Sequence, residues 1–111
     1  MNSIDLNCDL GEGFPNDEKL LSFISSANIA CGYHAGNEST VKRTIELCMK
    51  HNVAVGAHPG YADRENFGRN DQHLSFQEYY DLVAEQLYLF KKQADSFRCE
   101  SASCKTAWRI I

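Results

Sequence analysis

Apolar and polar side chains follow a strand-like period in three short segments of the chain. Residues 4–10 alternate apolar and polar side chains, which is typical of a strand with one buried face. Residues 27–31 form a second short apolar run that ends at a glycine. Residues 53–57 are apolar almost throughout, as expected of a strand that is buried on both faces of a parallel sheet. The pattern therefore predicts three strands.

Two helices are predicted between these strands. A short helix should cover residues 18–25, with Asn16 or Asp17 as its N-cap. A longer helix should follow Asn37 or Ser39 and end near residue 51, because its apolar positions fall on one helical stripe.

A third helix is predicted from Ser75 to about residue 97. Ser75 and Glu78 match a capping box, in which the two residues satisfy each other's backbone N–H groups. We expect its apolar face to lie in the core or at an interface. That face consists of Phe76, Tyr79, Tyr80, Val83, Leu87, Phe90, Ala94 and Phe97.

The order of these elements is β-α-β-α-β-α, which places the chain in the α/β class. Strands that alternate with helices form parallel β-α units with right-handed crossovers. In such folds the functional residues gather at the carboxyl ends of the strands.

Each of the three predicted strands has a titratable side chain at its end or shortly after it: Asp9, His34 and His58. A carboxylate at this position can act as a general base or bind a metal. Histidine suits proton transfer near neutral pH or metal ligation. Taken singly, Asp9 could be a loop cap and each histidine a solvated side chain. Their equivalent positions favour one shared site.

The loops around these residues are rich in glycine and carry two arginines. Glycine allows unusual backbone angles and close approach of backbone N–H groups to a ligand, although ordinary turns also use it. Arg64 and Arg69 could clamp a carboxylate or phosphate, or could simply be solvated. No Walker-type loop or G-x-G-x-x-G motif occurs. The glycines at the strand ends are Gly11, Gly13, Gly32, Gly36, Gly56 and Gly60.

Composition narrows the class further. The chain has 111 residues and a net charge of -4, enough for one domain and without the basic face that nucleic-acid binding needs. It shows no signal peptide and no apolar run long enough to span a bilayer, so we expect a cytoplasmic protein. Its five cysteines include no C-x-x-C pair, which favours reduced, buried thiols over disulfides or structural zinc.

Three motifs resemble those of a known family. Residues 5–14, residues 24–36, and residues 56–63 together with 67–69 are similar to the three N-terminal motifs of the LamB/YcsF family, to which the A subunit of bacterial 5-oxoprolinase belongs. The resemblance runs without a gap over residues 4–97.

The resemblance implies a distorted (β/α) barrel of the glycoside hydrolase and deacetylase type. It also implies ATP-dependent hydrolysis of 5-oxo-L-proline to L-glutamate, with ATP as co-substrate and with partner subunits B and C. Two alternatives stay open: a metal-dependent, deacetylase-like hydrolase, and a fragment without enzymatic activity. The resemblance leaves any metal ligand unassigned.

Carried over by position, six residues would line the site. One of the three catalytic candidates would activate water or position the lactam, and three further residues would bind substrate. The catalytic candidates are Asp9, His34 and His58, and the substrate-binding candidates are Glu12, Asn28 and Arg69.

The last residues differ from the family pattern. Residues 98–111 show no strand-like alternation and no family motif, so we place the family domain at residues 1–97. One permitted set of codons for this tail, read with its first base dropped, encodes the Pro-His-Gly-containing motif that the family carries after the third helix. We therefore expect a reading-frame shift near residue 97, with a diverged natural C-terminus as the rival explanation. The expected product exposes an unpaired edge after the third strand, aggregates readily and is inactive.

Overall fold

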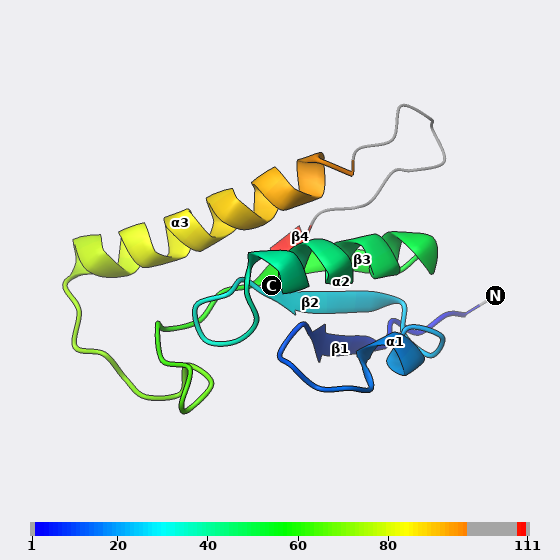
Figure 1. Cartoon of the computed structure of the whole chain (residues 1–111), viewed down its shortest axis with the longest axis horizontal. Coiled ribbons are helices and arrows are strands. Elements are labelled where there is room, and N and C mark those ends of the chain that lie inside the picture. Colours follow the sequence, from blue (N-terminus) through cyan, green and yellow to red (C-terminus); the bar gives the residue numbers. More distant parts are fainter. Residues whose placement is uncertain (1, 98–108, 111) are drawn as a thin grey trace.

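The computed structural model describes residues 2–97 and the backbone of residues 109–110. Its centre is a parallel sheet in which the strands lie in the order β1-β2-β3-β4 (Figure 1). The strands are β1 (Asn7–Leu10), β2 (Ser26–Ala30), β3 (Ala54–His58) and β4 (Arg109–Ile110). The predicted α/β class and the β-α-β-α-β-α order are thereby confirmed.

Three helices connect and follow the first three strands. Helix α2 packs on β2 and β3 and also against α3 (Figure 1). The helices are α1 (Asp17–Leu20), α2 (Glu38–Lys50) and α3 (Phe76–Asp95). No helix in the described part of the chain is long and apolar enough to cross a membrane.

The predicted caps of the two long helices are confirmed. Asn37 Oδ1 accepts a hydrogen bond from the Thr40 backbone N–H at 2.9 Å. Ser75 Oγ accepts one from the Glu78 backbone N–H at 3.2 Å. Each bond satisfies an N–H group that the first helical turn leaves unpaired.

The short first helix differs from its prediction. It ends at Leu20 instead of residue 25, since residues 21–23 form turns and the Ser25 backbone N–H bonds to the Leu6 carbonyl. Asn16 occupies the N-cap position but makes no side-chain capping bond. Asp17 Oδ2 instead accepts a hydrogen bond from the Gly11 backbone N–H at 2.8 Å. Its carboxylate therefore braces the loop after β1.

Strand β1 is shorter than predicted, because it begins at Asn7 and not at residue 4. The Leu6 carbonyl accepts hydrogen bonds from both the Ser25 and the Ser26 backbone N–H groups. This pairing does not continue the regular ladder toward Ile4, which is exposed.

The core lies between the sheet and α2. Every residue of β2 is buried, as are the three central residues of β3. This agrees with the expectation that strands in a parallel sheet are covered on both faces. The largest fully buried apolar side chains are Leu10, Ile29, Ile45, Cys48, Val53 and Val55.

Helix α3 is in the core over only half of its length. Phe90 and Ala94 are buried, whereas Phe76, at the N-terminal end, is 83% exposed. Figure 1 shows this yellow N-terminal half extending beyond α2 and the strands. The expectation that this face lies in the core is confirmed for the C-terminal half, and for the N-terminal half the alternative, an interface, stays a prediction.

Strand β4 corrects two expectations about the tail. Arg109 pairs with Gly56 and Ile110 with Ala57, in parallel orientation. The tail therefore contains a strand at these two residues, and the edge of β3 is paired there. The predicted domain boundary after Phe97 and the predicted frame shift concern residues 98–108, which lie outside the described part of the chain.

Candidate active site

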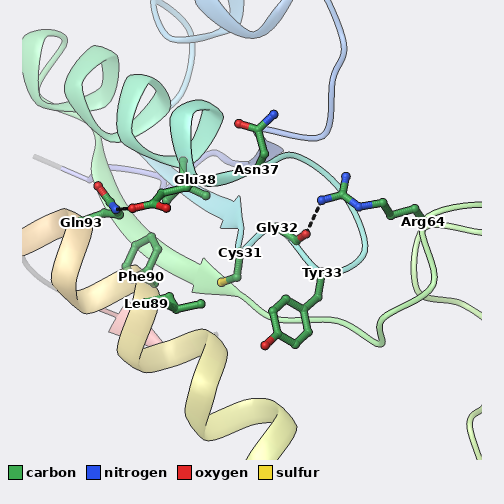
Figure 2. Close-up of a pocket in the computed structure, with 10 residues that line it drawn as sticks. Cys31, Gly32, Tyr33, Asn37, Glu38, Arg64, Leu89, Phe90 and Gln93 are labelled. Carbon is green, nitrogen blue, oxygen red and sulfur yellow. Dashed lines mark hydrogen bonds between the residues drawn. The ribbon is translucent and has the colours of Figure 1, made fainter.

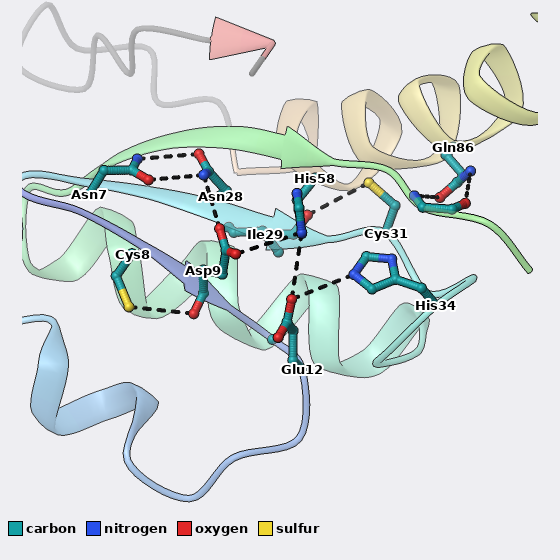
Figure 3. Close-up of polar contacts among 12 residues, drawn as sticks. Asn7, Cys8, Asp9, Glu12, Asn28, Ile29, Cys31, His34, His58 and Gln86 are labelled. Carbon is teal, nitrogen blue, oxygen red and sulfur yellow. Dashed lines mark hydrogen bonds and ion pairs between the residues drawn. The ribbon is translucent and has the colours of Figure 1, made fainter. Parts of the chain in front are cut away.

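Three chain segments bring two carboxylates and two imidazoles together at the carboxyl end of the sheet (Figure 3). Asp9 lies on β1 and Glu12 in the loop after it, while His34 lies in the loop after β2 and His58 ends β3. His58 Nε2 is 3.7 Å from Asp9 Oδ2 and 3.6 Å from Glu12 Oε1. His34 Nε2 is also 3.6 Å from Glu12 Oε1. The structure therefore places the three predicted catalytic residues together and puts Glu12 between the two histidines.

Asn28 reaches this site through Asp9. The strand register pairs Asp9 with Asn28. Asn28 Nδ2 donates to Asp9 Oδ1 at 3.0 Å and to Asn7 Oδ1 at 2.9 Å. Because one carboxylate oxygen of Asp9 is held in this way, the other is left facing His58. Asn28 thus fixes the orientation of Asp9, in addition to any contact with substrate.

His34 is the most enclosed of the four side chains. It is 2% exposed, and neither ring nitrogen has a hydrogen-bond partner among the described residues. Its ring packs edge-on against that of His58, with centroids 5.0 Å apart. Burial, followed by the nearby charge of His58, lowers the pKa of His34 below its usual value. The neutral imidazole, with a free lone pair, is therefore the favoured form.

Two glycines form the wall against which this imidazole packs. A Cβ atom at Gly60 would overlap His34 Nδ1, and one at Gly68 would lie 2.8 Å from His34 Cβ. Gly60 and Gly68 both belong to the polar segment after β3. Side chains at either position would displace the ring, so the absence of a side chain here is a requirement of the site.

Gln86 holds Gly60 in place, and the sequence did not predict this role. Its amide is fully buried on α3, where Gln86 Oε1 accepts from the Gly60 N–H at 2.9 Å and Gln86 Nε2 donates to the Gly60 carbonyl at 2.8 Å. A signal was present, because Gln86 lies four residues from both Leu82 and Phe90. A polar residue within an otherwise apolar helix face is a sign of a buried partner.

Arg64 ties down the loop that carries His34. Its Nη2 donates to the Gly32 carbonyl at 2.5 Å (Figure 2) and to the Gly36 carbonyl, also at 2.5 Å. Gly36 has φ +74° and lies so close to the Gly11 carbonyl that a Cβ there would be 2.5 Å from that oxygen. Arg64 is predicted from the sequence to bind a carboxylate or phosphate, or to be solvated. In the structure its guanidinium instead binds two backbone carbonyls.

Arg69 is not brought into the cluster. Its side chain is exposed, and no hydrogen bond or ion pair joins that side chain to another residue within the described ranges. Its predicted contact with substrate stays a prediction.

A separate cavity of about 240 Å³ lies between α3 and the segment that follows β2 (Figure 2). Leu89 and Phe90 of α3 and Cys31 at the end of β2 contribute to its lining. Burial raises the pKa of the Cys31 thiol to about 11, so the thiol is protonated and unreactive at neutral pH. This cavity is distinct from the four-residue cluster.

The chemistry open to the cluster follows from its groups. Two carboxylates and two imidazoles at this spacing can transfer protons to and from water or a polar substrate. Asp9 is 47% exposed and His58 is 35% exposed, so a small molecule can approach from their side.

Comparisons with known proteins agree with this description. The chain is 52% identical to the A subunit of 5-oxoprolinase from Bacillus thuringiensis subsp. konkukian (strain 97-27) and 49% identical to that from Brevibacillus brevis (strain 47). Each match covers 78% of this chain and 36% of the relative, so the chain spans about a third of their length.

The fold is also similar to that in the crystal structure of the lactam utilization protein from Thermus thermophilus, with a TM-score of 0.81 and 36% identity. That match covers 86% of this chain and 40% of the other. The LamB/YcsF family is matched over residues 4–105, a range that extends past the predicted boundary at residue 97. The chain therefore belongs to the LamB/YcsF family.

Proposed function

We propose that the chain acts as the A component of a 5-oxoprolinase, in the ATP-dependent opening of 5-oxo-L-proline to L-glutamate. The observation that carries the proposal is the cluster of Asp9, Glu12, His34 and His58, assembled from three strand ends. The relatives are named as a 5-oxoprolinase component and as a lactam utilization protein, and both names support the choice of a cyclic amide as substrate.

Hydrolysis of a lactam requires two proton transfers, one from the attacking water and one to the leaving nitrogen. The oxygen of water must bond to the carbonyl carbon while a proton leaves the water, and the carbon–nitrogen bond must break as the nitrogen gains a proton. An amide is a poor electrophile, and phosphoryl transfer from ATP to the amide oxygen would activate it, giving ADP and phosphate as the other products. The protein must then supply the proton transfers.

Asp9 is the best candidate for the group that removes the proton from water. It is the most exposed of the four side chains, and Asn28 holds one of its oxygens. Its free oxygen faces His58, which lies at the open side of the cluster and can pass a proton toward the leaving nitrogen. The exposed guanidinium of Arg69 would bind the carboxylate of 5-oxoproline, if that loop closes over the substrate.

The partners follow from the same proposal. The relatives are named as one component of an assembly, and we propose that subunits B and C complete it in the cytoplasm, where ATP is available. Neither nucleic acid nor membrane is a proposed partner, since the net charge is -4.

The alternative is a metal-dependent, deacetylase-like hydrolase, favoured by the ligand-like grouping of Glu12, His34 and His58. The two functions differ in substrate and in the need for ATP. The chain, assembled with subunits B and C, is incubated with 5-oxo-L-proline and ATP, and glutamate and ADP are measured by chromatography.

We expect glutamate and ADP to form in equal amounts and only when both substrates are present. Release of acetate from an N-acetylated sugar without ATP would instead support the deacetylase-like function. An assembled complex that forms neither product would contradict both and support a fragment without activity.

A further inference from the structure

We propose that Glu12, His34 and His58 form a binding site for one divalent transition-metal ion, with zinc as the best match. One ligand atom from each residue lies within 4.8 Å of the other two. The inference concerns the arrangement of the side chains themselves. It shares the cluster of the proposed function, but metal binding can be measured without turnover.

The distances fit coordination better than hydrogen bonding. Both histidine Nε2 atoms are 3.6 Å from Glu12 Oε1. A direct N–H···O hydrogen bond would bring such atoms to about 2.7–3.2 Å. Ligands at about 2.0–2.2 Å from a tetrahedral zinc ion lie roughly 3.3–3.6 Å from one another. The spacing of Glu12 from the two imidazoles therefore leaves room for an ion between them.

His34 gives an independent reason. A polar side chain that is 2% exposed normally has a hydrogen-bond partner, because an unpaired buried polar group costs about 1–3 kcal/mol. Neither nitrogen of His34 has one among the described residues. Gly60 closes the Nδ1 side of the ring, so Nε2 is the atom that faces Glu12 (Figure 3). A metal ion would satisfy this buried lone pair.

The choice of metal follows from the donor atoms. Two imidazole nitrogens favour zinc and other first-row transition metals over magnesium or calcium, which prefer oxygen ligands. Three protein ligands with an open fourth position are typical of catalytic zinc sites, in contrast to closed structural sites. His58 is 35% exposed, so the open position would lie on its side, next to Asp9.

Asp9 would then act beside the ion and not as a ligand of it. Its Oδ1 is held by Asn28, and its Oδ2 approaches His58 Nε2 at 3.7 Å. A metal ion lowers the pKa of a bound water, and a neighbouring carboxylate can take the released proton. This arrangement would strengthen the water activation that the proposed function requires. Because His58 Nε2 would then bind the ion, Asp9, and not His58, would pass the proton on to the leaving nitrogen.

The test uses the purified 111-residue chain, stripped with a chelator and titrated with Zn²⁺ or Co²⁺. We expect one ion per chain, and a visible Co²⁺ absorption spectrum of nitrogen and oxygen ligation without a thiolate charge-transfer band. His58→Gln and Glu12→Gln should each weaken Zn²⁺ binding at least tenfold, as measured by competition with a chromophoric chelator. Circular dichroism of each variant checks that it is folded.

Two matched controls lie elsewhere in the same chain. His51→Gln and His73→Gln remove histidines outside the cluster and should leave the affinity unchanged. Three results would overturn the proposal: no bound ion in the folded wild-type chain, a thiolate band that places the ion on cysteine, or equal affinity of folded His58→Gln and wild type. Any of these can occur whether or not 5-oxoproline is turned over, so the two proposals fail separately.

Discussion

Gln86 and Gly60 exchange two hydrogen bonds, at 2.9 and 2.8 Å, and so join helix α3 to the loop that packs against His34. Gln86→Leu would keep the size of the side chain but leave the Gly60 N–H and carbonyl without partners. We expect a loss of about 2–3 kcal/mol in the free energy of unfolding, measured by urea denaturation.

Gln93→Leu is the matched control for this change. Gln93 lies on the same helix and donates to Glu38 Oε1 at 2.7 Å, but that bond is exposed. We expect its loss to change stability by no more than about 0.5 kcal/mol. Equal losses for the two variants would show that burial of the Gln86 amide does not matter.

Gly60→Ala should displace His34. The added Cβ would overlap the imidazole, and overpacking of this kind costs about 1–3 kcal/mol of stability. The His34 ring signals in a two-dimensional NMR spectrum should shift.

Gly13→Ala is the control for Gly60→Ala, because it adds backbone strain without displacing the His34 ring. Gly13 has φ +92°, yet no atom in the described part of the chain lies within 4 Å of a Cβ built there. Alanine at this position should lower stability through its backbone alone and leave the His34 signals in place. Unchanged His34 signals in Gly60→Ala would contradict the predicted overlap.

Arg64→Ala should loosen the loop that carries His34, because its guanidinium bridges the carbonyls of Gly32 and Gly36. Arg64 is exposed, so the expected loss of stability is only about 1 kcal/mol. Hydrogen exchange of residues 32–36, measured by mass spectrometry, should become faster. Arg43→Ala, an exposed arginine on α2, should leave that exchange unchanged, and protection in Arg64→Ala equal to wild type would rule out the clamp.

Buried thiols give a prediction about reactivity. Burial raises the pKa of Cys31 to about 11 and that of Cys48 to about 12, from the usual 9.0. At pH 8 a rise of about two units leaves about a hundredfold less thiolate, the form that reacts with iodoacetamide. Cys8 is only partly buried and should be alkylated before Cys31 and Cys48. Peptide mass spectrometry checks this order, and native labelling of Cys31 as fast as of Cys8 would refute it.

The sequence predicted the site in outline because its position depends on local features. Asp9, His34 and His58 each lie at or just after the carboxyl end of a strand, and parallel strands bring such residues to one edge of the sheet. The caps at Asn37 and Ser75 depend only on the next three residues, and both are confirmed.

What the sequence could not predict depends on partners far away along the chain. Gln86 bonds to Gly60, 26 residues earlier, and Arg64 bonds to Gly32, 32 residues earlier. No local pattern indicates which distant carbonyl an arginine or glutamine will meet. The apolar face of α3 is buried at Phe90 and exposed at Phe76. Periodicity could not predict this difference, since it identifies a face and not what covers it.

The most direct test of the central claim is the rate of glutamate formation by Asp9→Asn in the complex with subunits B and C. Asparagine keeps the size of the side chain and can still bond to Asn28, but it cannot accept a proton from water. We predict that kcat falls by about 10²–10⁴-fold with KM nearly unchanged, while Asp95→Asn, an exposed change at the end of α3, has no effect. A kcat of Asp9→Asn within about twofold of wild type would contradict the account.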